Sequence, residues 1–138
     1  MELKDAFEMI TEAIYGFLAT SEGEKPKVRP MRPCVSDAGT LLISVLPGRR
    51  CTEHIKVNDN VEMCFMGKEY AHCRVAGKAK MTEDVAKKKE LLEKAPDLYQ
   101  FVKGVDDPNY GLIEVHLNYA EIVPAGAQKP VVVLSEEM

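Results

Sequence analysis

Apolar and polar residues alternate with a period of three to four positions at the start of the chain. Because apolar side chains at Leu3, Phe7 and Ile10 would share one face of an α-helix, this spacing predicts a helix over residues 3–13. Three further segments are predicted to be helical, with Thr82 as the N-cap residue of the middle one: residues 51–57, 82–95 and 96–102.

Six runs rich in β-branched and other apolar residues lie between these helices, bounded by Gly, Pro, Asn or Asp. They predict strands over residues 15–20, 27–36, 40–46, 61–66, 70–80 and 111–123. Short turns join most of these strands, so the sheet should be antiparallel, and closure into a barrel would remove its open edges. The pattern therefore predicts one domain over residues 1–138, with an antiparallel six-stranded barrel and peripheral helices.

Three details refine this barrel. Pro30 and Pro33 cannot donate to a strand ladder, so the strand over residues 27–36 should lie at an edge or beside a ligand. Gly77 inside the fifth strand predicts a bulge or a close backbone approach. The tail over residues 126–138 contains the apolar run 131–134, which predicts either an added edge strand or a dimer contact.

Composition narrows the class of protein. The formal net charge of −4 argues against nucleic acid as a partner, because phosphate backbones need a broad basic surface. The sequence has no apolar run as long as a membrane span and no signal-peptide pattern, so we expect a cytoplasmic protein. Its four cysteines form no Cys-x-x-Cys pair, and we predict no metal site.

Two arginine-bearing segments, residues 28–33 and 47–52, flank the predicted strand 40–46. If the turn at Asp37-Ala38-Gly39 closes a hairpin, these segments lie on neighbouring strands and can converge on one small anion. A guanidinium donates two parallel hydrogen bonds, a geometry that suits phosphate. The alternative is that these arginines are solvated charges at strand ends.

Side chains typical of catalysis are not grouped along the chain. The sequence lacks a Gly-rich phosphate loop and a G-x-S-x-G nucleophile elbow. Its histidines, His54, His72 and His116, are scattered, and alternation with Glu114 and Asn118 predicts a solvent-facing His116. The chain thus has arginines suited to a phosphate but no group of catalytic side chains, which indicates that a cofactor carries the reactivity.

Several motifs, in this order, resemble the pyridoxamine 5′-phosphate oxidase-like, FMN-binding split-barrel proteins. The resemblance covers residues 14–126 and is carried by Gly16-Phe17-Leu18-Ala19-Thr20, Val28-Arg29-Pro30-Met31, Leu42-Ile43-Ser44-Val45, Arg49-Arg50, Asn58-Asp59-Asn60-Val61 and the stretch from His72 to Ala79. It implies an α+β, mainly antiparallel fold: a six-stranded split β-barrel that binds FMN at the interface of a homodimer.

The resemblance also implies which residues contact the cofactor. Arg29, Pro30 and Met31 match positions along the isoalloxazine and ribityl groups, and Ser44 and Val45 match a pair that contacts the flavin. Arg49 and Arg50 match the basic pair that holds the FMN phosphate. His72 matches a polar position that reaches the cofactor, often from the other subunit.

The implied activity is that of an FMN-dependent oxidoreductase acting on a small molecule. The chain departs from the vitamin B6 oxidases at several positions. Cys34 stands where they have lysine, Cys51 matches their second basic residue unless Arg49 replaces it by a shift of register, and residues 122–126 replace a segment with an expected aromatic. We therefore expect a smaller flavoprotein similar to nitroimidazole-resistance reductases. The alternative is a protein of the same fold that binds flavin or haem without turnover.

Overall fold

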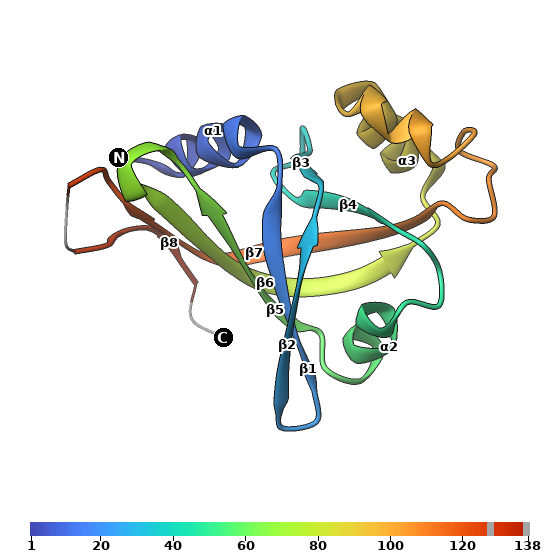
Figure 1. The fold of residues 1–138 in the computed structure, drawn as a ribbon, viewed down its shortest axis with the longest axis horizontal. Helices are drawn as coiled ribbons and strands as arrows, with labels where there is room; N and C mark the ends of the chain where they lie inside the picture. Colours follow the sequence, from blue (N-terminus) through green and yellow to red (C-terminus); the bar gives the residue numbers. More distant parts are fainter. Residues whose placement is uncertain (127–128, 137–138) are drawn as a thin grey trace.

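The protein forms one curled antiparallel sheet with helices at its periphery (Figure 1). This computed structural model describes residues 1–126 and 129–136, so residues 127, 128, 137 and 138 of the predicted tail lie outside the described residues. The elements in chain order are α1 (Leu3–Ala13), β1 (Gly16–Glu22), β2 (Lys25–Met31), β3 (Pro33–Val35), β4 (Leu41–Val45), α2 (Arg50–Val57), β5 (Asn60–Met66), the 3₁₀ turn η1 (Lys68–Tyr70), β6 (His72–Thr82), α3 (Val85–Lys94), the 3₁₀ helix η2 (Pro96–Gln100), β7 (Gly111–Val123) and β8 (Val131–Ser135).

The order of the strands explains the curl of the sheet. Hydrogen-bonded neighbours follow the order β2-β1-β5-β6-β7-β4-β3, and β8 pairs with β7. The two ends of this order, β2 and β3, are consecutive in sequence and separated only by Arg32. The sheet must therefore curl until its two edges approach each other at Arg32, where they remain unpaired. This arrangement confirms the predicted α+β split barrel.

The predicted count of six strands is wrong, because the described residues form eight. The strand expected over residues 27–36 divides at Arg32, whose guanidinium leaves the sheet and donates to both carboxylate oxygens of Asp97 at 3.0 and 3.2 Å. Pro33 then begins β3, which pairs with β4 and not with β1. The run at residues 131–135 adds β8 beside β7, so the tail supplies an added strand.

Two apolar clusters fill the interior. Ala6 and Ile10 of α1 pack on inward side chains of the sheet such as Leu18 and Phe65, all fully buried. A second cluster lies under α3 and joins Leu91 to residues of β4 and β7. Full burial of an aliphatic side chain stabilises a fold by about 1.5–3 kcal/mol, so α1 and α3 are held chiefly by these faces.

Gly77 lies at a bulge, as predicted. The register between β6 and β7 shifts between Ala76 and Gly77. A Cβ atom built on Gly77 would lie 2.1 Å from the backbone oxygen of His116, much closer than van der Waals contact. The position therefore requires glycine because the neighbouring strand approaches too closely for a side chain.

One local prediction, at the end of β6, is wrong. Asp84, not Thr82, is the N-cap of α3: its side chain accepts a hydrogen bond from the backbone N–H of Lys87, while Thr82 still belongs to β6. In β7, His116 is exposed as predicted, but Glu114, two residues before it, is buried. The cause is α3, which covers this end of the sheet and brings the Lys87 Nζ to 2.7 Å from the Glu114 Oε1.

None of the helices in residues 1–126 and 129–136 has both the length and the apolar character needed to cross a bilayer.

Candidate functional site

A cavity of about 500 Å³ opens where the two edges of the barrel meet. Its lining contains seven of the eight residues predicted to contact a cofactor, together with Leu46 and Cys51: Arg29, Pro30, Met31, Ser44, Val45, Arg49 and Arg50. We call this cavity the arginine pocket. Its size lies within the range typical of small-molecule sites.

The sheet curvature brings these segments together. The turn at residues 37–39 closes the predicted hairpin, with the backbone N–H of Ser36 donating to the Thr40 carbonyl at 2.8 Å. In this hairpin Pro33 pairs with Ile43, and Met31 and Val45, each two residues beyond this pair, both line the pocket. Arg29 belongs to β2, which pairs with β1 and not with β4. It lines the same pocket because the chain passes from β2 to β3 at Arg32.

One end of the arginine pocket is positively charged. After the turn at Gly48, which has φ +87°, Arg49 is the N-cap of α2 and Arg50 is its first residue. The first N–H groups of a helix lack intrahelical acceptors, and arginine offers none to cap them. Two exposed guanidinium groups therefore stand beside a helix N-terminus, an arrangement suited to a phosphate.

The other walls of the pocket are largely apolar. Met31, Val45 and Leu46 contribute aliphatic or thioether groups, and Cys51 is buried. Burial raises the pKa of the Cys51 thiol, while the nearby Arg29 opposes this shift in part. Because the pKa is raised above the ordinary thiol value, Cys51 presents an uncharged thiol at neutral pH. An apolar wall next to a cationic end suits a ligand with a flat ring and an anionic group.

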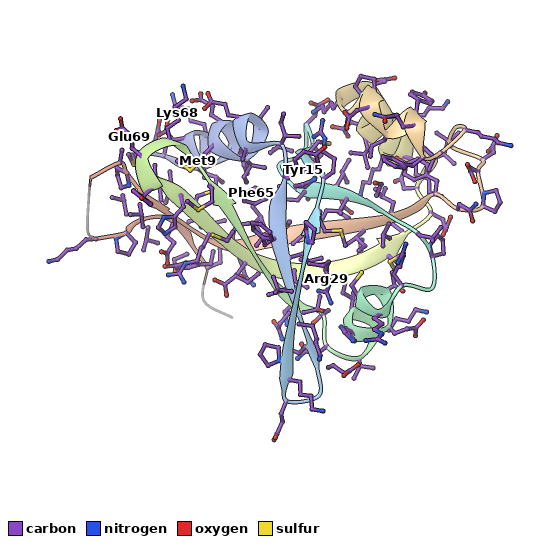
Figure 2. All side chains as sticks on the ribbon, viewed as in Figure 1. Met9, Tyr15, Arg29, Phe65, Lys68 and Glu69 are labelled. Atoms are coloured by element: carbon purple, nitrogen blue, oxygen red, sulfur yellow. The ribbon has the colours of Figure 1, made fainter. Side chains whose placement is uncertain are left out.

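Arg29 is fixed by a network that the sequence pattern did not indicate. Its Nη1 donates to the Thr20 Oγ1 at 2.7 Å, and Thr20 lies 2.8 Å from the Nδ1 of His54. Figure 2 labels Arg29 on the β1–β2 hairpin. The sequence signal for this network was a polar residue at a position expected to face inward. Thr20 lies on the same face of β1 as Leu18, and His54 adjoins Ile55 on the buried face of α2.

A second hollow of about 370 Å³ adjoins the arginine pocket. It shares Ser44, Val45, Leu46 and Arg49 with that pocket and is completed by Phe101, Val102, Asn109 and Tyr110. The two hollows together extend from the N-terminus of α2 to the loop after η2. The loop residues had no motif that marked them, since they are distant in sequence from both arginine segments.

His72, the eighth predicted residue, does not line the arginine pocket. It begins β6, where it pairs with Met66 and Val123, and its Nδ1 lies 3.0 Å from the Tyr70 carbonyl oxygen. Side chains alternate between the two faces of this strand, since Cys73 is buried whereas Arg74 is exposed. Within one chain, His72 therefore belongs to the outer face of the sheet.

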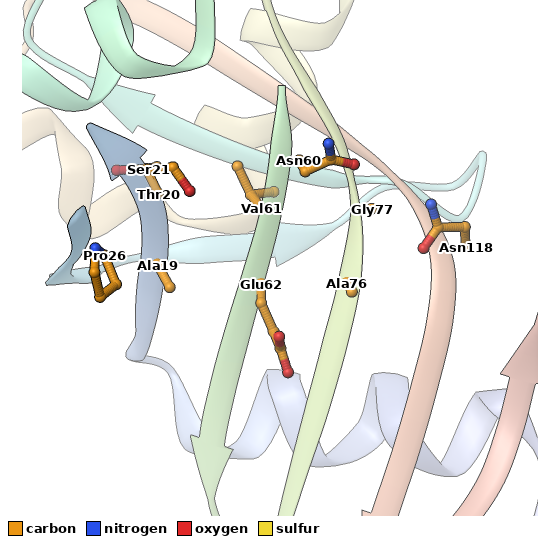
Figure 3. Close-up of a pocket in the computed structure, with 10 residues that line it drawn as sticks. All are labelled: Ala19, Thr20, Ser21, Pro26, Asn60, Val61, Glu62, Ala76, Gly77 and Asn118. Carbon is orange, nitrogen blue, oxygen red and sulfur yellow. The ribbon is translucent and has the colours of Figure 1, made fainter. Parts of the chain in front are cut away.

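The outer face of the sheet, away from α1, is partly apolar and hollowed. Figure 3 shows its hollow of about 290 Å³, which is lined by the small residues Ala19 of β1 and Ala76 and Gly77 of β6. Pairing also places Phe17, 51% exposed, between Pro30 of β2 and Cys64 of β5. The outer face thus begins at the arginine pocket, because Pro30 belongs to both.

The comparisons agree with this geometry. The family described as "Pyridoxamine 5'-phosphate oxidase like" matches residues 2–136, so the chain belongs to the pyridoxamine 5′-phosphate oxidase-like family. Among the curated proteins, none matches the chain.

Three solved structures illustrate the likeness. A NimC/NimA family protein from Clostridium acetobutylicum has 25% identity and a TM-score of 0.83, with coverage of 95% of this chain and 90% of its own. A heme binding protein from Mycobacterium smegmatis has 12% identity and a TM-score of 0.76, with coverage of 96% and 58%. An FAD-binding protein from Mesorhizobium loti has 16% identity and a TM-score of 0.68, with coverage of 87% and 90%. The last two identities are low enough that these similarities show the fold alone.

Proposed function

We propose that the protein binds FMN in the arginine pocket and acts as an oxidoreductase toward a small-molecule acceptor. The observation that carries this proposal is the convergence of Arg29–Met31, Ser44–Val45 and Arg49–Arg50 on one cavity from three separate segments. A solvated strand-end charge needs no such convergence. The proposal is also consistent with the chain's family and with the relative described as FAD-binding.

The residues present fit FMN at both ends. Arg49, Arg50 and the first N–H groups of α2 would hold the phosphate. Pro30, Met31 and Val45 offer an apolar surface for the ring, and Arg29 and Ser44 offer polar groups beside it. FMN, when bound, supplies hydride or electron transfer. The task of this chain is therefore to hold the ring, neutralise the phosphate and exclude water from one side.

We further propose a homodimer in which the outer face of each sheet packs on its partner. Phe17 and Met66 are 51% and 50% exposed on this face, so apolar side chains there lack cover within one chain. The outer face reaches the arginine pocket at Pro30 and extends across the paired strands to Arg74, near His72. A partner on this face could thus bring its own His72 toward the pocket, which a single chain does not do.

The experiment is a flavin titration of the purified protein after removal of any bound cofactor. FMN fluorescence should be quenched on binding, and FMN should bind more tightly than riboflavin because only FMN has a phosphate. Addition of a nicotinamide donor and a quinone or nitro compound then tests turnover. Absence of FMN binding contradicts the proposal.

The same titration separates the alternative of a haem protein. Haem binding would produce a Soret band, and a bound flavin would produce yellow absorbance that survives desalting. A protein that binds FMN without turnover with any donor would be a flavin carrier. Cytoplasmic location, which is also part of the proposal, is tested by cell fractionation.

A further inference from the structure

A polar network with a buried centre connects the arginine pocket with the buried face of α2. It consists of Arg29, Thr20, His54 and Glu22, and we call it the His54 network. We propose that the His54 network positions Arg29 for the flavin, with Thr20 and His54 acting as positioning residues that do not themselves touch the ligand. This inference rests on the proposed function, since it concerns the same pocket.

Arg29 is held at one end and open at the other. Its Nη1 donates to the Thr20 Oγ1 at 2.7 Å and to the Leu18 carbonyl oxygen at 3.1 Å, with a longer contact of 3.4 Å to the Lys27 carbonyl. Within residues 1–126 and 129–136, every hydrogen bond of this side chain comes from Nη1. The Nε–H and Nη2–H groups are thus left for a ligand in the cavity that Arg29 lines.

The donors and acceptors of the network have a definite direction. Arginine is a donor only, so the Thr20 hydroxyl accepts from Arg29 and donates its own hydrogen to the Nδ1 of His54, 2.8 Å away. The Nε2 of His54 lies 3.3 Å from a carboxylate oxygen of Glu22, which can only accept. A neutral His54 must therefore carry its proton on Nε2.

Through Thr20, the network also links Arg29 of β2 with α2, and both of these elements line the pocket. Thr20 belongs to β1 and His54 to α2, the helix whose first residue is Arg50. Both side chains are buried, at 3% and 7% exposure. Two apolar residues could fill this contact without any polar group to satisfy. The polar pair does more, because its hydrogen bonds fix the guanidinium of Arg29 relative to the helix that carries the other two arginines.

The test compares two substitutions of one residue. Thr20→Val keeps the shape of the side chain but removes the hydroxyl, whereas Thr20→Ser keeps the hydroxyl. We expect Thr20→Val to raise the Kd for both FMN and riboflavin by about three- to tenfold, because Arg29 loses its bond to Thr20 but keeps its bond to the Leu18 carbonyl. Thr20→Ser should bind both flavins within about twofold of wild type, because its hydroxyl can still accept from Arg29 and donate to His54. Because Arg29 is assigned to the ring side, the loss should not depend on the phosphate.

The outcomes distinguish this inference from the proposed function. If wild type binds FMN and Thr20→Val binds both flavins equally well, the positioning role is wrong and the proposed function stands. Equal weakening by Thr20→Val and Thr20→Ser also overturns it, since a hydroxyl then has no effect. If wild type binds neither flavin, the proposed function fails and this inference fails with it.

A second measurement needs no flavin. In the apo protein, ¹⁵N NMR of the imidazole should show His54 protonated at Nε2 and unprotonated at Nδ1. Protonation at Nδ1 would overturn the direction of the network. His54→Asn, whose side-chain oxygen can replace Nδ1 as the acceptor from Thr20, should retain riboflavin affinity better than His54→Leu. Equal affinities of these two variants would contradict the role of His54.

Discussion

Removal of both arginines at the start of α2 is expected to weaken FMN binding by about a hundredfold. Neither Arg49 nor Arg50 makes a side-chain hydrogen bond or ion pair within residues 1–126 and 129–136, and both are exposed. A charge-assisted hydrogen bond contributes about 1.5–3 kcal/mol, and exposure favours the lower value, so two bonds amount to about 3 kcal/mol. The N–H groups of α2 remain in the double variant, so some affinity for phosphate should persist.

The assay is a titration of wild type and of Arg49→Ala/Arg50→Ala with FMN and with riboflavin. Only the FMN affinity should fall, because riboflavin has no phosphate. The melting temperature of the apo protein should stay the same. Lys4→Ala/Lys89→Ala is a matched control, since it also removes two exposed positive charges outside the pocket lining. An equal loss of FMN affinity in this control, or an equal loss of riboflavin affinity in the arginine variant, would refute the assignment of the phosphate site.

Three other variants test the remaining features. Phe17→Asp should convert a homodimer into a 15.4 kDa monomer in sedimentation analysis, because it places a carboxylate in the outer face. A wild-type protein that is already monomeric would contradict the proposed homodimer. His72→Ala should weaken FMN binding several-fold and shift the flavin potential, since one neutral hydrogen bond contributes about 0.5–1.5 kcal/mol; unchanged affinity and potential would make His72 a surface residue only. Gly77→Ala should lower the free energy of unfolding by about 1–3 kcal/mol through overpacking. Gly104→Ala should not, because a Cβ atom at Gly104 meets no atom within 4 Å. Equal unfolding curves for the two variants would contradict the close approach at Gly77.

Local periodicity predicted most of the elements correctly. The helix over residues 3–13 and the strand over residues 111–123 have the bounds that the sequence predicted. The reason is that each element needs an apolar face, and the period of that face is set within the segment itself. The turn at Asp37-Ala38-Gly39 was also predicted correctly, because its residues favour a turn in any context.

Local periodicity did not predict the contacts between segments that are distant in sequence. Arg32 looked like part of one long strand, but its ion pair with Asp97 of η2 divides that strand in two. Glu114 is buried although His116 on the same strand is exposed, because α3 covers Glu114. Thr20 and His54 carried no motif, and only the packing of α2 on β1 shows that they support Arg29.

The sequence by itself determined most of the antiparallel strands, the arginine segments and the glycine at the bulge, because each depends on residue types within a few positions. Only the tertiary structure decided how those segments meet. The one-residue connection at Arg32 places β2 and β3 at opposite edges of the sheet, and the curl that results brings Arg29 to Arg49 and Arg50 while leaving His72 on the outer face. Sheet curvature arises from pairing across the whole chain, so no local pattern could contain it.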